Sequence, residues 1–312
     1  MNNLKVVFMG TPSFAVPILE GLINNYNVVM VVCQPDRKKN RKGEVIKPET
    51  KILAESHNIK VFQPLKIKED YQPILDMKPD IIITCAYGQI IPKEVLDYPK
   101  YGAINVHASL LPRHRGGAPI HRAIIEGDSK SGVTIMYMGE GMDAGDIISQ
   151  REVDILDSDT AESLFDKLSI LGSSLLLDTL PSIIDGSAQR TKQDESLVTY
   201  SYNIKPEDEL IDFTKTRREV FNQIRGLNSW PVAHTYLDSK RLKVWESRIG
   251  DDKVRGECGV ITNTYKDGIG VQTSDGEIIL TSIQPEGKKR MNSSDYLNGI
   301  SDKKSLLNKK LG

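Results

Sequence analysis

The sequence predicts an α/β fold in which a doubly wound, mostly parallel sheet is followed by a small OB-like β-barrel domain. Short apolar runs alternate with amphipathic stretches throughout the first half of the chain. Two of these runs, 28–32 and 81–83, contain no polar residue, which is typical of strands buried on both faces of a parallel sheet. Beyond Gly186 this pattern ends, and short strands separated by turn dipeptides follow.

The elements of the first half follow from these apolar runs and from apolar residues at helical spacing. The predicted strands are 5–9, 28–33, 60–62, 80–85, 103–106, 133–136 and 147–152. The predicted helices are 14–24, 49–57, 69–77, 92–96, 119–126 and 161–184. Open sheets of this kind bind ligands beyond the carboxyl ends of their strands, so we expect a functional site at that edge.

The second half opens on a polar stretch, 187–209, without helical or strand periodicity. A helix is predicted next, at 216–227, and five short strands are predicted at 232–237, 242–246, 259–263, 270–273 and 277–283. Their number and spacing favour a small barrel of the OB type. We therefore expect an α/β domain that carries the chemistry at 1–188, a linker at 189–207 and a second domain at 208–312.

The composition is that of a globular protein, with 39% hydrophobic and 27% charged residues. A formal net charge of −1 permits a polyanionic partner without requiring one. The first residues resemble neither a signal nor a transit sequence, and no apolar run is long enough to span a membrane. Cys33, Cys85 and Cys258 lie far apart, which indicates reduced thiols. These features predict a cytoplasmic protein with no membrane partner.

The turn after the first predicted strand reads Gly10-Thr11-Pro12-Ser13. It lacks both the Gly-Lys-Ser/Thr ending of a P-loop and the three glycines of a dinucleotide-binding fingerprint. The favoured interpretation is a tight turn with Ser13 as a helix cap.

Asn105 and His107 are the first candidates for chemistry, because they stand two apart where a predicted strand ends. On an extended strand that spacing puts both side chains on one face. The alternative is an Asn and a His that are merely solvated at a loop. A zinc site built from His107, His114 and His121 is not favoured, since no cysteine or carboxylate completes it at a familiar spacing. We therefore expect no metal.

A glycine-rich loop, 138–146, supplies the third candidate, Asp143. Asp143 and Asp146 could simply bind turn amides. Next to Asn105 and His107, however, a carboxylate would complete a set for acyl transfer: an amide donor for an oxyanion, a base and a group that orients the base. No Gly-x-Ser-x-Gly motif is present, so the set has no protein nucleophile.

These segments resemble the family of formyltransferases that use 10-formyltetrahydrofolate. The shared motifs are Asn105-x-His107, Ser109-Leu110-Leu111-Pro112, His114-Arg115-Gly116-Gly117 and the Asp143 loop. Residues 10–17 and 34–37 resemble the members that act on methionyl initiator tRNA, and 193–196, 229–231 and 287–291 agree with them. The resemblance covers almost the whole chain. It implies a Rossmann-like formyltransferase domain followed by a tRNA-binding domain.

The resemblance also implies roles for individual residues. Asn105 would hold the formyl oxygen as it becomes an oxyanion, His107 would take part in proton transfer, and Asp143 would hold His107. The implied folate-binding positions are Ser109, Leu110, Leu111, Pro112, Tyr87, Gln89, Ile91, Gly139 and Asp143. The co-substrate would be 10-formyltetrahydrofolate, read mainly by backbone groups in an apolar slot.

The stretch 36–43 concentrates positive charge, with Arg37, Lys38, Lys39, Arg41 and Lys42. The resemblance implies that it grips the tRNA acceptor stem, with Arg41 aligned to the essential arginine of the family. Lys38-Lys39-Asn40 replaces the commoner Pro-Ala-Gly, which leaves the conformation of the loop open. Further phosphate contacts are expected from Lys240, Arg241, Lys288, Lys289 and Arg290. The alternative for all of these is a solvated surface.

The function predicted from the sequence is formyl transfer from 10-formyltetrahydrofolate to methionyl initiator tRNA, in support of translation initiation. We expect a monomer in a bacterial-type cytoplasm. A formyltransferase for an amino sugar nucleotide, or a formyltetrahydrofolate hydrolase, shares the three central residues but does not need the basic stretch. A non-catalytic RNA-binding protein is the second alternative, and the intact set Asn105, His107 and Asp143 argues against it.

Overall fold

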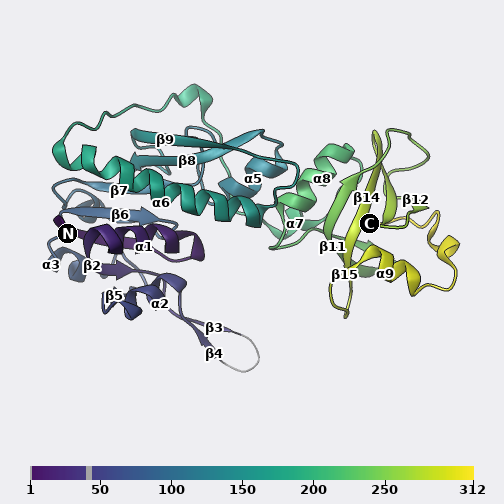
Figure 1. The fold of residues 1–312 in the computed structure, drawn as a ribbon, viewed down its shortest axis with the longest axis horizontal. Coiled ribbons are helices and arrows are strands. Elements are labelled where there is room, and N and C mark those ends of the chain that lie inside the picture. The colour runs from purple at the N-terminus through teal and green to yellow at the C-terminus, as the bar shows by residue number, and fades with distance from the viewer. Residues whose placement is uncertain (1, 40–43) are drawn as a thin grey trace. The chain divides into compact units, whose positions relative to one another are not determined.

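The computed structural model describes residues 2–39 and 44–312, which form two compact units (Figure 1). The first unit comprises Met1–Pro119, Ser131–Val153 and Phe165–Ser201. The second comprises Ile120–Lys130, Asp154–Leu164 and Tyr202–Gly312. The second unit thus includes two segments from the first half of the chain, and the first unit reaches through most of the polar stretch 189–207. Independent domains with boundaries at 188 and 208 stay a prediction.

The first unit is built on a seven-stranded sheet with the order β5-β2-β1-β6-β7-β8-β9. Its strands are β1 Asn2–Gly10, β2 Tyr26–Val32, β5 Lys60–Phe62, β6 Ile81–Cys85, β7 Ala103–His107, β8 Lys130–Tyr137 and β9 Ile147–Asp154. The pairs from β5 to β7 are parallel, whereas β7 and β8 are antiparallel. The predicted mostly parallel sheet is therefore confirmed, and the predicted strands lie within a few residues of the observed ones.

Helices cover the sheet because alternate residues of its central strands face opposite sides. Val7 and Met9 of β1 belong to a core that includes Ile74 and Val95, which come from two of the short helices. The helices of this unit are η1 Ser13–Ala15, α1 Val16–Asn25, α2 Glu49–Ser56, α3 Gln72–Asp76, α4 Lys93–Leu96 and, mostly, α6 Ala161–Asp185.

The long helix α6 packs closely on the sheet at Gly172. A Cβ atom there would lie 3.1 Å from Val106 and 3.6 Å from Val133, so the helix approaches β7 and β8 where it has no side chain. In the described part of the chain, α6 is the one helix long and apolar enough to cross a membrane by length and composition. Leu168 and Leu176 are fully buried, and packing of this kind accounts for its apolar residues.

A hairpin, which the sequence did not predict, extends from the sheet beyond β2 (Figure 1). It pairs β3 Arg37–Lys39 with β4 Glu44–Ile46. Its base is fastened by Asp36, whose carboxylate accepts hydrogen bonds from Lys51 Nζ at 2.8 Å and Gln63 Nε2 at 2.8 Å. The predicted basic residues Arg41 and Lys42 lie outside the described residues.

The second unit carries an antiparallel sheet with the order β10-β11-β14-β13-β12, and β15 pairs with β14. The strands are β10 His234–Leu237, β11 Lys240–Ile249, β12 Ile261–Thr264, β13 Ile269–Thr273, β14 Gly276–Pro285 and β15 Met291–Asn292. The predicted fold class, a mostly parallel sheet followed by a small antiparallel one, is confirmed. Closure of this second sheet as an OB barrel stays a prediction.

Helix α8, Arg217–Gly226, packs on this second sheet and begins at a capping box. Thr216 Oγ1 accepts from the backbone N–H of Glu219, and Glu219 Oε2 accepts from the backbone N–H of Thr216. Val220 and Ile224 then enter a core with strand residues such as Val244. The remaining helices of this unit are α5 Pro119–Ile125, α7 Pro206–Glu209, α9 Ser293–Asn298 and η3 Lys303–Leu306.

Part of the polar stretch predicted as a linker is bonded to the first unit. Thr191 and Ile147 form a backbone bridge, and Tyr200 forms another with Arg115. A 3-10 turn, η2 Glu195–Leu197, lies between them, capped by Asp194. Residues 191–201 therefore run from the start of β9 to the loop that follows β7.

Candidate active site

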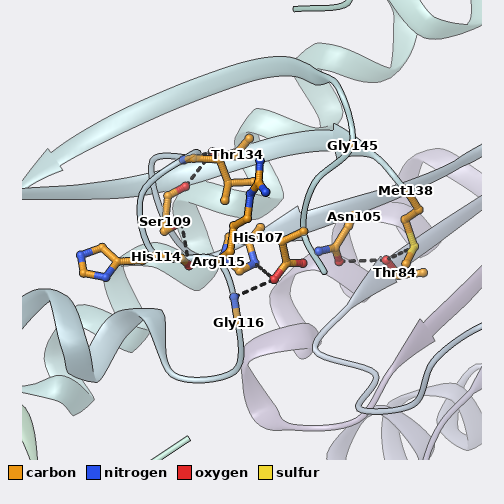
Figure 2. A network of polar contacts seen from close by, with 12 residues as sticks. Thr84, Asn105, His107, Ser109, His114, Arg115, Gly116, Thr134, Met138 and Gly145 are labelled. Atoms are coloured by element: carbon orange, nitrogen blue, oxygen red, sulfur yellow. Dashed lines mark hydrogen bonds and ion pairs between the residues drawn. The ribbon is translucent and has the colours of Figure 1, made fainter. Parts of the chain in front are cut away.

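Asn105 and His107 lie together near the carboxyl end of β7 (Figure 2). Thr84, from the neighbouring strand β6, donates to Asn105 Oδ1 at 2.8 Å. Because the amide oxygen is engaged in this way, the amide nitrogen is the end that can act as a donor in the site. Figure 2 shows this nitrogen on the side of Asn105 that faces His107. The arrangement fits the predicted role of Asn105 as a donor to a developing negative charge.

His107 is buried, and its orientation is set by a backbone carbonyl. Its Nε2 lies 2.9 Å from the carbonyl oxygen of His114. A carbonyl only accepts hydrogen bonds, so Nε2 carries a hydrogen in this arrangement. In a neutral ring with that hydrogen, Nδ1 is the nitrogen that can accept a hydrogen bond. His114 supplies its carbonyl from a left-handed backbone conformation, with φ of 62°, and its own Nδ1 lies 2.7 Å from Ser201 Oγ.

Asp143 faces the reactive nitrogen of His107. Its Oδ2 lies 3.7 Å from His107 Nδ1, which is ion-pair range for a protonated ring but longer than a hydrogen bond. The same oxygen accepts from the backbone N–H of Gly116 at 2.9 Å. The role of Asp143 in holding the ring stays a prediction: the His114 carbonyl bonds to one nitrogen of His107, and Asp143 lies beside the other. An imidazole nitrogen and a carboxylate oxygen thus face each other at this place in the site.

Glycines allow the two loops around Asp143 to approach their neighbours. Gly116 has φ of 118°, and a Cβ atom there would lie 2.7 Å from the carbonyl oxygen of Ser201. A Cβ atom on Gly145 would lie 1.8 Å from the carbonyl oxygen of Tyr137. Both positions therefore exclude side chains, so the glycines of these motifs have a steric reason.

Polar side chains fix the segment after His107 (Figure 2). Ser109 Oγ donates to the carbonyl of Arg113 at 2.8 Å, and Thr134 Oγ1 donates to the carbonyl of Ser109 at 2.6 Å. Thr134 Oγ1 also accepts from the backbone N–H of Leu111 at 3.1 Å. Ser109 and Leu111 are buried and engaged in this support, while Leu110 and Pro112 are half-buried.

Comparison with known proteins identifies the family. The formyl transferase family profile matches residues 4–180, and that of the formyl transferase C-terminal domain matches residues 203–301. This chain belongs to the formyl transferase family. A relative from Geobacillus sp. (strain WCH70), named methionyl-tRNA formyltransferase, is 52% identical over 300 residues, which is 95% of this chain and 94% of that one. A relative of the same name from Bacillus subtilis (strain 168) is 51% identical over 299 residues, with the same coverage of both chains.

Solved structures of other formyl transferases share the fold. An N-formyltransferase from Helicobacter canadensis, in complex with folinic acid and dTDP-3-aminofucose, has a TM-score of 0.69 at 23% identity, over 90% of this chain and 99% of that one. Methionyl-tRNA formyltransferase from Clostridium thermocellum has a TM-score of 0.56 at 21% identity, over 80% of this chain and 95% of that one. At these identities the likeness supports the fold alone.

The folate-binding positions that the formyl transferase motifs imply lie on the loops that follow β6, β7 and β8. Tyr87 and Ile91 are buried in the core under the sheet, and Gln89 Oε1 accepts from the backbone N–H of Ile67 at 2.8 Å. Burial raises the pKa of the Tyr87 hydroxyl, which makes no hydrogen bond within the described residues. Gly88 and Gly139 are exposed, so backbone groups of both loops are accessible.

A cavity of about 450 Å³ lies beside the loop of Tyr87. Its lining combines the ends of β1, β2 and β6 with the foot of the hairpin: Thr11, Pro12, Gln34, Pro35, Arg37, Ile46, Lys47, Pro48, Glu49, Ala86, Tyr87 and Gly88. Thr11 and Gln34 help to shape it, because Gln34 Nε2 donates to the Tyr87 carbonyl at 2.9 Å and Thr11 Oγ1 accepts from the Gln34 backbone at 3.1 Å. The cavity therefore lies between the loop after β6 and the foot of the basic hairpin.

The predicted tRNA-binding residues differ in their surroundings. Arg37 is exposed, and Lys38 and Lys39 complete β3. In the second unit, Arg241 pairs with Glu209 at 3.0 Å, and Arg290 pairs with Glu246 while its guanidinium stacks over Trp245 at 4.8 Å. Lys240, Lys288 and Lys289 are exposed. Carboxylates therefore offset part of the positive charge that the sequence places in the second unit.

No group of three His, Cys, Asp or Glu side chains capable of holding a metal occurs in residues 2–39 and 44–312. The three regularly spaced histidines have separate partners. His107 bonds to the His114 carbonyl, His114 to Ser201, and His121 to the carbonyl of Trp230 at 3.3 Å.

Sequence reasoning missed Thr84, Arg115 and Gln193 as parts of the site. Thr84 ends a strand next to β7, so its position in the predicted sheet was a usable signal. Arg115 and Gln193 fall inside motifs already recognised for the family, but nothing in those motifs shows that their side chains meet at 3.0 Å.

Proposed function

We propose that this chain transfers the formyl group of 10-formyltetrahydrofolate to the amino group of methionine on initiator tRNA. The observation that carries the reaction is the convergence of the Asn105 amide, His107 Nδ1 and Asp143 Oδ2 at the carboxyl edge of the sheet. The relatives named methionyl-tRNA formyltransferase, which match this chain over nearly its whole length at 51–52% identity, support the choice of acceptor.

The reaction makes one amide bond and breaks another. The amine nitrogen attacks the formyl carbon, the formyl oxygen becomes an oxyanion, the amine loses a proton, and the folate nitrogen gains one as it leaves. Asn105 Nδ2 would donate to the oxyanion. An oxyanion donor of this kind typically contributes about 10²–10³ in rate.

His107 and Asp143 would carry the proton. Nδ1 of His107 is free to accept because Nε2 is bonded to the His114 carbonyl. A carboxylate 3.7 Å from Nδ1 stabilises the ring once it is protonated, and it can accept a proton itself. Together they would take the proton from the amine and return it to the folate nitrogen.

The loops around Tyr87 and Gly139 fit the folate co-substrate. A flat heterocycle needs an apolar floor and a few backbone donors and acceptors rather than a charged pocket. The buried Tyr87 and Ile91 would supply the floor, and the exposed backbone at Gly88 and Gly139 would supply the polar groups. Leu110 and Pro112, half-buried at the end of β7, would border the same slot.

The basic residues would bind the phosphates of the tRNA acceptor stem. We propose this role for Arg37, Lys38, Lys39, Arg41 and Lys42 in the first unit and for Lys240, Arg241, Lys288, Lys289 and Arg290 in the second. The protein would act as a monomer in the cytoplasm.

One assay separates this proposal from its alternatives. Purified protein is given 10-formyltetrahydrofolate with charged initiator tRNA, charged elongator methionine tRNA, a dTDP-linked amino sugar or water alone. We expect formyl-methionine on the initiator tRNA only. Formylation of the sugar, or hydrolysis of the donor at the same rate without any acceptor, would overturn the proposal, as would binding of tRNA with no turnover.

A further inference from the structure

Gln193 joins the two loops that meet at the carboxylate of Asp143. Its Nε2 donates to the carbonyl oxygens of Asp143 at 2.7 Å and Gly145 at 2.8 Å, and its Oε1 accepts from Arg115 Nε at 3.0 Å. Carbonyls only accept and the guanidinium only donates, so the orientation of this amide is unambiguous. One side chain thus bonds to the loop that carries Asp143 and to a residue next to Gly116.

Arg115 gives Gln193 a fixed anchor. The side chain of Arg115 is 3% exposed, and its Nη atoms bind Glu195 at 2.8 and 3.3 Å as a two-pronged pair. Its backbone is bonded too, since its N–H donates to the Thr199 carbonyl at 2.9 Å and its carbonyl accepts from Ser201 at 2.7 Å. Residues 193–201 therefore hold Arg115 by both its side chain and its main chain.

The loop around Asp143 needs such support. Asp143 has φ of 49°, a left-handed conformation that a residue with a Cβ atom keeps only when its surroundings enforce it. Residues 139–142 just before it are exposed. The two carbonyls that Gln193 binds flank Ala144, directly after Asp143, and no side chain of the loop could replace those two donors.

Gln193 is also connected to both residues of the hydrogen bond that places the carboxylate, Asp143 and Gly116. Asp143 Oδ2 accepts from the backbone N–H of Gly116 at 2.9 Å. The main chain on the Asp143 side is bonded to Gln193 directly, and the main chain on the Gly116 side is bonded through the adjacent Arg115. Loss of the Gln193 amide would let the two loops move independently, and the distance from the carboxylate to His107 Nδ1 would no longer be fixed.

We propose that Gln193, anchored by Arg115 and Glu195, is a positioning residue that sets the place of the Asp143 carboxylate next to His107. The inference rests on the proposed function, in which that carboxylate takes part in proton transfer. Gln193 touches only loop backbone and Arg115 among the contacts described, so it acts through Asp143 and not on the substrates.

The test compares Gln193→Ala and Gln193→Glu with wild type in steady-state formylation of methionyl initiator tRNA. Glutamate keeps the shape and the acceptor for Arg115 but removes both donors, so it separates donation from packing. We expect kcat to fall at least about tenfold in both variants, since misplacement of a catalytic group by 1 Å can cost about 10²-fold. KM for tRNA and for the formyl donor should change less than about twofold.

The matched control is Gln272 in the second unit, which has the same bonding pattern. Its Nε2 donates to the carbonyls of Thr273 and Gly276, both at 2.8 Å, and its Oε1 accepts from the backbone N–H of Arg255 at 2.7 Å. Gln272→Ala should lower the thermal midpoint at least as much as Gln193→Ala does, yet leave kcat at saturating substrates unchanged. A kcat that falls in step with the thermal midpoint in both variants would make Gln193 merely structural.

A double-mutant cycle with Asp143→Asn distinguishes the two proposals. If Gln193 acts through Asp143, Gln193→Ala should cost less than about threefold in the Asp143→Asn background. A tenfold loss that persists there would overturn the positioning role while leaving the proposed function intact. An Asp143→Asn variant as active as wild type would instead overturn the role of the carboxylate, and the inference with it.

Discussion

Polar side chains have different kinds of partner at the carboxyl edge of the first sheet and on the cationic surface of the second unit. At the edge, Asn105 and His107 each have a neighbour that fixes one atom and leaves another facing the site, and the Gly116 N–H holds Asp143 Oδ2 beside His107. On the second unit, Arg241 and Arg290 are held by carboxylates that oppose their charge. In the proposed function, the first pattern would prepare groups for a reaction, and the second would moderate the attraction for a polyanion.

The difference indicates where changes should matter. Where a side chain is held in place for the reaction, replacing it should remove most of its contribution to the rate. Charges that meet a partner through solvent act in parallel, so the loss of any one is partly compensated by the others.

The largest expected effect is at the edge. Asn105→Ala removes the amide donor while Thr84 and the strand remain, so kcat should fall by about 10²–10³ with normal tRNA binding. Stopped assays of formyl-methionine with saturating substrates measure this, and circular dichroism checks the fold. A loss below about tenfold would place the chemistry elsewhere.

Arg41 should have the next largest effect. A guanidinium can make paired hydrogen bonds to a phosphate or a base edge that an ammonium cannot copy. Arg41→Lys should therefore already lower kcat/KM for tRNA, whereas Lys39→Ala should mainly weaken binding and reduce the salt slope by about 0.9 for each phosphate that is no longer neutralised. Filter-binding titrations at several salt concentrations measure both. Wild-type rate and slope in Arg41→Ala would mean that the basic stretch is only solvated.

A smaller effect, in the opposite direction, is expected at Glu246. Glu246→Gln releases Arg290 from its ion pair, so tRNA should bind more tightly, by up to about fivefold at low salt. The control is Glu257→Gln, which breaks the pair at 3.1 Å with Lys310, a lysine outside the set proposed to bind tRNA. Equal gains in both variants would reflect net charge alone, and no gain in Glu246→Gln would remove Arg290 from the proposed tRNA surface.

The smallest effect concerns stability in acid. Burial first, and then the positive charges of Arg241 and Lys243, lower the pKa of His234, while Glu209 opposes them. In the unfolded chain the histidine has a pKa of about 6.5, so it takes up a proton more readily there than in the folded protein. The difference in proton uptake has no effect on the free energy of unfolding well above that pH, and it lowers this free energy as the pH falls below it. His234→Gln should therefore lose less thermal stability than wild type between pH 7.5 and 5.5, and an equal loss would contradict the assignment.

Much of the first sheet was predictable because burial on both faces leaves a clear pattern. Strand β5 at Lys60–Phe62 was predicted with its observed bounds, and β7 was predicted to within a residue. The hairpin of β3 and β4 was not predicted, because its strands are only three residues long, β3 is entirely basic and neither strand shows apolar alternation. Polar composition likewise predicted a linker where residues 191–201 bond to the first unit.

For the candidate site, the sequence predicted which residues to consider but not their geometry. The two-residue spacing placed Asn105 and His107 on one face, and the structure agrees. That the His114 carbonyl would bind His107 depends on a left-handed turn seven residues on, which spacing cannot reveal. The contact of Gln193 with the Asp143 loop joins residues 50 positions apart, so only the folded chain brings it into view.

The bond between His107 Nε2 and the His114 carbonyl has a consequence for the timing of the proposed reaction. While Nε2 is engaged in this bond, the imidazole can take up a transferred proton only at Nδ1, on the side of Asp143. A ring already protonated at Nδ1 cannot accept the proton of the amine, and a ring that has accepted it must pass it on before it can accept another. In the proposed reaction, proton uptake and proton release would therefore alternate at Nδ1, and each formyl transfer would return His107 to its starting protonation state.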